Sequence, residues 1–89
     1  MRKIYKVYEM MFWPLPGEKM DIRYKGESVS EAKAMAKKVA KEWANPGERV
    51  HVWDVGSPDN KPNIKLTGYC VDESDYGAML VEVTKNAEE

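Results

Sequence analysis

The residue types that most often carry out catalysis are scarce in this chain. It has 89 residues, with a single histidine, His51, and a single cysteine, Cys70. A histidine can act as a general base, and a cysteine held as a thiolate by a basic partner can act as a nucleophile. The two lie in different predicted elements. We interpret His51 as a solvent-facing residue beside Trp53, and Cys70 as a buried, reduced thiol. We therefore expect the chain not to be an enzyme and to have no catalytic residues.

Acidic residues at 72–75 have the composition of a calcium-binding loop. Such a loop places oxygen ligands at alternate positions and closes with a glutamate. Here Tyr76 stands at a ligand position and Val83 at the closing position, so we interpret the segment as a solvated hairpin turn. The six glycines are isolated and form no phosphate-binding loop. We expect neither a metal site nor a cofactor.

Lysines of one predicted helix have a spacing that suits contacts with phosphate groups of nucleic acid. They are Lys33, Lys37, Lys38 and Lys41. Rings that can stack on bases are predicted to share the sheet face away from this helix. These are Tyr5, His51, Trp53 and Tyr69. Because the two features point to opposite faces, nucleic-acid binding is an alternative function, and a solvated lysine face is the other interpretation.

Large apolar residues fill positions 10–16, at the end of a predicted hairpin. Aromatic and methionine side chains on a rigid turn make good anchors for a protein partner. Two other interpretations are that the segment folds back over the open sheet face, and that this face forms a homodimer. We predict that a larger protein or complex binds through residues of the tip and the sheet. They are Phe12, Trp13, Leu15, Trp53 and Tyr69.

The element that must organise these side chains is one helix over residues 28–43. Ser28 and Glu31 have capping-box spacing at its start, and residues 45–47 (Asn-Pro-Gly) stop it. Apolar residues follow at three- and four-residue steps, which predicts a stripe that packs on a sheet. The stripe is Ala32, Met35, Ala36, Val39, Ala40 and Trp43.

Alternating patterns predict five strands around this helix. Their residues are 3–13, 18–25, 48–55, 63–71 and 76–85. The first is apolar on both faces, which predicts a central strand. The second has one wet face, with Met20, Ile22 and Tyr24 on the buried side. The order predicts an α+β fold: a mainly antiparallel five-stranded sheet with one helix packed on one face. We expect one domain, residues 1–85, and a frayed tail, residues 86–89.

Charge is distributed unevenly although the net charge is only -1. Residues 1–49 hold 11 basic and 7 acidic residues, whereas residues 50–89 hold 3 basic and 8 acidic residues. Two interpretations stay open: a dipolar recognition surface, or halves that interleave in the sheet and cancel. The first residues are too charged for a signal peptide, and no run has the length of a membrane span. We expect a cytoplasmic protein that does not bind membranes.

Residues 28–36, Ser-Val-Ser-Glu-Ala-Lys-Ala-Met-Ala, resemble the helix start of many small bacterial and phage proteins. Those proteins share the order of two strands, a helix and several strands. In size and layout the chain resembles phage-encoded anti-CRISPR inhibitors, including one family that acts on type I-F complexes. The resemblance implies a mobile-element protein in a bacterial host that inhibits a nucleic-acid-processing complex by binding it. It transfers no functional residue.

Overall fold

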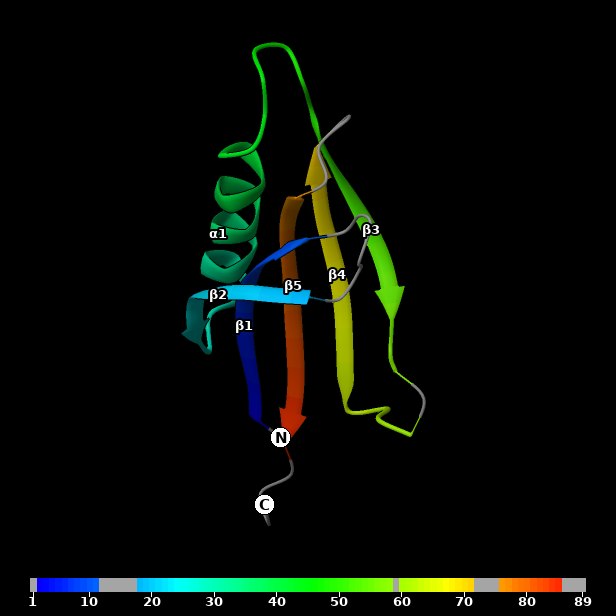
Figure 1. Cartoon of the computed structure of the whole chain (residues 1–89). Coiled ribbons are helices and arrows are strands. Elements are labelled where there is room, and N and C mark those ends of the chain that lie inside the picture. Colours follow the sequence, from blue (N-terminus) through cyan, green and yellow to red (C-terminus); the bar gives the residue numbers. More distant parts are fainter. Residues whose placement is uncertain (1, 12–17, 59, 72–75, 86–89) are drawn as a thin grey trace.

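The computed structural model describes residues 2–11, 18–58, 60–71 and 76–85 (Figure 1). Its elements follow the predicted order and confirm the α+β fold. They are β1 (Arg2–Met11), β2 (Glu18–Gly26), α1 (Val29–Lys41), β3 (Val50–Gly56), β4 (Ile64–Val71) and β5 (Tyr76–Lys85). The end of the first predicted strand, residues 12 and 13, lies outside the described residues.

The five strands form one antiparallel sheet in the order β2-β1-β5-β4-β3. β1 therefore lies between β2 and β5, which confirms that it is an inner strand. The pairing of β1 with β5 joins the first and last strands of the chain, from Arg2 opposite Lys85 to Met11 opposite Tyr76. Helix α1 connects β2 at one edge of the sheet to β3 at the other (Figure 1).

Helix α1 begins where the capping residue predicts. The Ser28 hydroxyl accepts a hydrogen bond from the Glu31 amide at 3.2 Å, which satisfies one of the free N–H groups of the first turn. The Glu31 carboxylate, expected to complete the capping box, instead accepts a hydrogen bond from the Tyr24 hydroxyl at 3.1 Å. The helix ends two residues earlier than predicted, at Lys41. Beyond it the Trp43 ring stacks on Tyr76, with centroids 4.4 Å apart.

The main core lies between α1 and the sheet. The predicted helix stripe is confirmed, because Ala32, Ala36, Val39 and Ala40 are fully buried. They face buried side chains from three strands of the sheet, namely Tyr5, Val7, Tyr69, Val71, Ala78 and Leu80. Alanines let a helix approach a sheet closely, so this core is thin and depends on few large side chains.

A second apolar cluster lies on the sheet face opposite α1. Met10, Met79 and Val81 are buried there, and partly buried side chains surround them: Tyr8, Ile64, Leu66 and Val83. β5 takes part in both clusters, so its residues 77–81 are buried consecutively rather than alternately. The helix thus covers one face of the sheet, as predicted, and the other face carries an apolar cluster of its own.

Strand β2 departs from the predicted alternation. Its register with β1 shifts twice, once between Val7 and Tyr8 and once between Glu9 and Met10. After the first shift Tyr24 lies opposite Val7 and packs on the main core, whereas Ile22 lies opposite Tyr8 and is 52% exposed. The prediction that Ile22 and Tyr24 share one buried face is therefore wrong. Bulges also increase strand twist, and Figure 1 shows β2 turned across the direction of the other strands.

The first register shift leaves Arg23 without an opposite residue on β1, and its guanidinium joins three elements. Arg23 Nη1 donates to Glu9 Oε1 at 3.0 Å, and Nη1 and Nη2 donate to the two carboxylate oxygens of Glu42 at 2.9 and 2.7 Å. Glu9 is buried, whereas Glu42, at the end of α1, is more exposed. Arg23 therefore fixes the end of the helix to β1 and β2 by charge-assisted hydrogen bonds, and its contact with Glu42 is bidentate.

These contacts predict an acid-dependent loss of stability. The hydrogen bonds from Arg23 hold the pKa of Glu42 below its ordinary value. The resulting stabilisation is fully present above the pKa of a glutamate in the unfolded chain, about 4.3, and is lost as the pH falls through the lower value in the folded chain. We expect the thermal midpoints of wild type and Glu42→Gln, measured from pH 7 down to 3, to differ at neutral pH and to converge at the acid end. Parallel curves would contradict the assignment.

Candidate functional site

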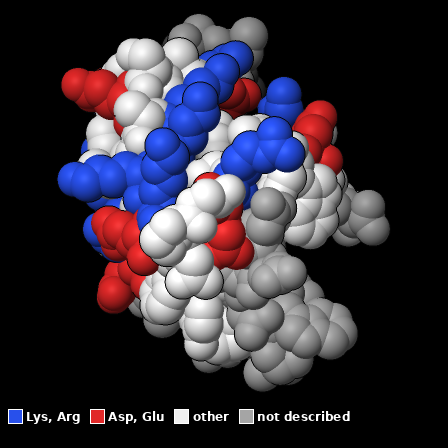
Figure 2. Space-filling view, turned by 90° about the horizontal axis from the view of Figure 1, so that it is seen from above, with Lys and Arg blue, Asp and Glu red and all other residues white. Residues whose placement is uncertain are grey.

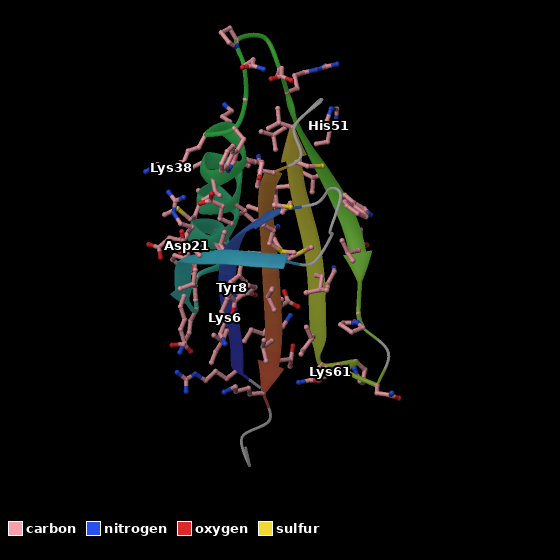
Figure 3. The ribbon with its side chains drawn as sticks, viewed as in Figure 1. Lys6, Tyr8, Asp21, Lys38, His51 and Lys61 are labelled. Atoms are coloured by element: carbon pink, nitrogen blue, oxygen red, sulfur yellow. The ribbon has the colours of Figure 1, made fainter. Side chains whose placement is uncertain are left out.

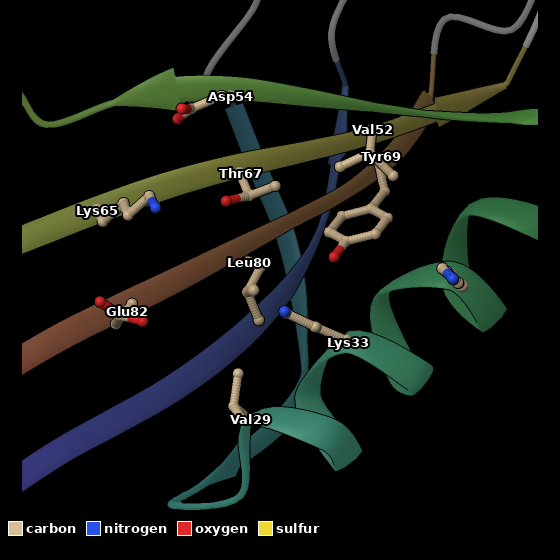
Figure 4. Close-up of a pocket in the computed structure, with 10 residues that line it drawn as sticks. Val29, Lys33, Val52, Asp54, Lys65, Thr67, Tyr69, Leu80 and Glu82 are labelled. Atoms are coloured by element: carbon tan, nitrogen blue, oxygen red, sulfur yellow. The ribbon is translucent and has the colours of Figure 1, made fainter.

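Helix α1 leaves part of the sheet uncovered on its own side, and this uncovered part forms a groove. The groove lies between α1 and strands β3, β4 and β5, and has a volume of about 480 Å³ (Figure 4). That volume lies within the usual range for small-molecule sites, roughly 300–1,000 Å³.

Two elements supply most of the groove's functional groups. Helix α1 contributes Val29, Lys33 and Lys37. Strand β4 contributes Lys65, Thr67 and Tyr69, which alternate along the strand and therefore share its helix-facing side. The neighbouring strands add Val52, Asp54, Leu80 and Glu82. The walls thus combine three ammonium groups, two carboxylates, two hydroxyls and three apolar side chains.

Tyr69 is the least exposed polar residue that lines this groove. The residue is only 3% exposed, and its hydroxyl forms no hydrogen bond with a described residue. Burial raises the pKa of this hydroxyl above its ordinary value, so it stays protonated and can donate a hydrogen bond. Figure 4 shows the Tyr69 hydroxyl and the Lys33 ammonium pointing into the same space between the sheet and α1.

Charges are separated along the groove by the strand register. Val52 lies opposite Tyr69, and Asp54 lies opposite Thr67, one step further along the sheet. Glu82 lies opposite Lys65, four residues from Tyr69 along β4 and so about 13 Å away. The carboxylates therefore lie toward the end of the groove remote from Tyr69.

Strand β3 forms a second feature of this side of the molecule, an edge of the sheet. Among the described residues no strand lies beside its outer edge. Its side chains are exposed on both faces: Val52 at 57% on the groove side, and Trp53 at 49% and Val55 at 39%. The pairing of β3 with β4 is regular from Val50 to Asp54. No lysine or proline interrupts this stretch, although such residues commonly protect sheet edges.

The opposite edge, β2, is of a different kind. Its two register shifts break the regular row of backbone groups. Its sequence alternates charged residues, including Asp21, Arg23 and Lys25, with apolar ones. Bulges and charges are standard means of preventing strand addition. Of the two edges, only β3 therefore presents a regular stretch without lysine or arginine.

The structure separates the residues that the sequence predicted to bind a partner. Phe12, Trp13 and Leu15 lie outside the described residues. Trp53 is exposed on the face away from the helix, as predicted. Tyr69 lies on the other face and is buried, because it is paired with Val52 rather than Trp53. Tyr5 is also buried against α1, so the prediction of one aromatic face with Tyr5, His51, Trp53 and Tyr69 is wrong.

The four helix lysines are all exposed, but they do not form one site. Lys33 and Lys37 line the groove, whereas Lys38 and Lys41 lie in the last turn. Figure 2, which looks onto the end of the fold where α1 leads into β3, shows basic side chains in a band with acidic ones on both sides. The surface is therefore mixed in charge. Nucleic-acid binding by these lysines stays a prediction.

The single histidine and the single cysteine prove to be neighbours. His51 and Cys70 are opposite residues of β3 and β4, on the face away from α1. Figure 3 shows His51 on the far side of the molecule from Lys38, so the imidazole and the lysine face do not combine. Sequence reasoning missed this pairing because register between strands is not visible in either strand alone. Within the described residues no three histidine, cysteine or acidic side chains gather to hold a metal ion.

Comparison with known proteins identifies no relative of this chain. No family model, curated protein or solved structure matches the chain. Over the part of the chain that the structure describes, no helix is both long enough and apolar enough to cross a membrane. The candidate sites are therefore argued from this structure alone.

Proposed function

We propose that this chain is a protein-interaction module that binds an extended segment of a partner protein along the outer edge of β3. The observation that carries the proposal is the contrast between the two sheet edges. β3 carries a regular row of backbone groups beside which no described strand lies, whereas two register shifts break the row on β2. Main-chain hydrogen bonds to such an edge supply affinity, and alternate side chains supply specificity.

The exposed side chains of β3 define the chemistry of the segment. Val52 lies on one face of the sheet and Trp53 on the other, and both are about half exposed. A strand added beside β3 would place its own side chains next to both of them. The favoured partner segment is therefore extended and apolar on both sides. Tryptophan is also among the residues that most often dominate binding energy at interfaces.

The test is a selection of displayed ten-residue peptides on the immobilised chain, followed by affinity measurement. We expect the selected peptides to carry β-branched or aromatic residues and to protect β3 amides from hydrogen exchange. Trp53→Lys should weaken their binding at least tenfold, about the size of an interface hot spot. Ile22→Lys on β2, an equally exposed apolar residue, is the matched control and should change affinity less than twofold.

Two outcomes would overturn the proposal. One is that no peptide is selected, or that the selected peptides bind Trp53→Lys as well as wild type. The other is that the chain sediments as a dimer that Trp53→Lys dissociates, since the edge would then serve a second copy. Thermal midpoints of both variants close to wild type would show that the fold is intact.

The narrower identity, an inhibitor of a host nucleic-acid-processing complex, stays a prediction from the resemblance in layout. It would make a subunit of such a complex the source of the extended segment. The alternative, nucleic-acid binding through the lysines of α1, predicts affinity that falls steeply with salt. A binding series at low ionic strength separates it from strand addition, which depends little on salt.

A further inference from the structure

We propose that the groove between α1 and strands β3–β5 binds a small phosphate ester that carries hydroxyl groups, with the phosphate held by Lys33, Lys37 and Tyr69. This site is independent of the edge of β3. It is defined by one tyrosine hydroxyl, the ammonium groups that line the groove with it and the carboxylates toward the remote end.

The Tyr69 hydroxyl is the first group that points to a ligand. The residue is only 3% exposed, and its hydroxyl lines the groove without a hydrogen bond to a described residue, so it is available to donate one. It is aimed into the groove (Figure 4). A phosphate oxygen placed there would accept its hydrogen bond.

The ammonium groups supply the charge that a phosphate requires. Lys33 and Lys37 are one turn apart on α1, about 6 Å along its axis, and both line the groove. Neither forms an ion pair with a described residue. Two lysines and a protonated tyrosine therefore line one groove, with neither ammonium group in an ion pair to a described carboxylate, and such groups can bind an oxyanion.

The rest of the groove selects what the phosphate is attached to. Asp54 and Glu82 lie toward the other end, and carboxylates accept hydrogen bonds from hydroxyl or amine groups. They would repel a second anionic group there. Leu80 lies between the two ends and gives an apolar floor. A sugar phosphate or a nucleoside monophosphate has this combination of a phosphate at one end and hydroxyls at the other.

The experiment is a titration of the whole chain followed by NMR chemical shifts, with four probes: glucose 6-phosphate, adenosine 5′-monophosphate, inorganic phosphate and glucose. We expect at least one ester to bind at least tenfold more tightly than inorganic phosphate or glucose. The tighter ester identifies which of the two sources the groove favours. The largest shifts should fall on Tyr69, Thr67 and the first turns of α1.

Variants separate a built site from general charge attraction. Lys33→Gln/Lys37→Gln should weaken binding of the tighter ester at least tenfold. Tyr69→Phe, which removes only the hydroxyl, should weaken it about fivefold, the usual effect of one hydrogen bond. Lys38→Gln/Lys41→Gln removes the same charge from the same helix outside the groove and should change affinity less than twofold. Equal losses in both double variants, or binding of neither ester, would overturn the proposal.

Discussion

Val39→Ala is expected to lower the free energy of unfolding by about 2 kcal/mol, whereas Val29→Ala should change it by less than about 0.5 kcal/mol. Both substitutions remove the same two methyl groups from the same helix. Both also replace a β-branched residue by the best helix former, so the gain in helix propensity is shared. A difference between the free energies of unfolding of the two variants therefore reports the difference in burial of the two side chains.

The expected difference follows from where the two side chains lie. Val39 is fully buried between α1 and the sheet, and it is one of the two largest side chains in the structure that are fully buried. Its neighbours along the stripe are alanines, which cannot extend into the space left by the missing methyl groups. Val29, by contrast, is 40% exposed in the first turn. A cavity therefore forms in one variant and not in the other.

Urea unfolding of both variants and wild type measures these changes. For a domain of this size, a loss of 2 kcal/mol also lowers the thermal midpoint by about 8–16 °C. The slope of unfolding against urea should stay the same, because the unfolded surface hardly changes. Equal stability of the two variants would mean that α1 can settle onto the sheet and close the cavity.

The periodicity of the sequence was sufficient to predict the elements and the helix stripe. Alternation and three- to four-residue spacing are local properties, and each fixes one element at a time. Ala32, Ala36 and Val39 lie where the stripe places them. The neighbours in the sheet could not be predicted in this way, because the pairing of β1 with β5 joins residues more than seventy positions apart, such as Ile4 and Val83.

Local bulges account for the error in β2. Counting by twos assigns Ile22 and Tyr24 to one face, and this rule fails as soon as one extra residue enters the strand. Arg23 is the extra residue, and the residues next to it in the sequence do not indicate a bulge. Its role becomes apparent only once Glu9 and Glu42, distant along the chain, are seen to meet it.

The groove was missed for a different reason. Lys65 and Thr67 share one side of β4 with Tyr69, and Tyr69 was predicted to lie with other rings on the sheet face away from the helix. In the structure this is the helix side, and it is polar at one end because α1 does not extend over that part of β4. When every second residue of a strand changes from polar to apolar along its length, the pattern indicates that a helix covers only part of that face of the strand.

Arg23→Met is expected to destabilise the fold by about 2 kcal/mol, and Glu9→Gln in the same chain should restore at least half of the loss. Removing the guanidinium leaves the Glu9 carboxylate buried, with a side chain only 12% exposed, and without its cation. An unpaired buried charge is more costly than the pair is stabilising. Neutralising Glu9 removes that cost, although the hydrogen bond is still absent.

Glu42→Gln is the matched control, since it removes the other carboxylate bound by the same guanidinium. The side chain of Glu42 is 40% exposed, so water can solvate it and the loss should stay below about 1 kcal/mol. A double-mutant cycle over Arg23 and Glu9, measured by urea unfolding at neutral pH, should give a coupling of at least about 1 kcal/mol. Additive losses would show that Arg23 stabilises the hairpin through the packing of its aliphatic stem. In that case the bulge would act by placing the alkyl part of the Arg23 side chain against the hairpin. The Glu9 carboxylate would then have to be solvated by water that reaches it past β2.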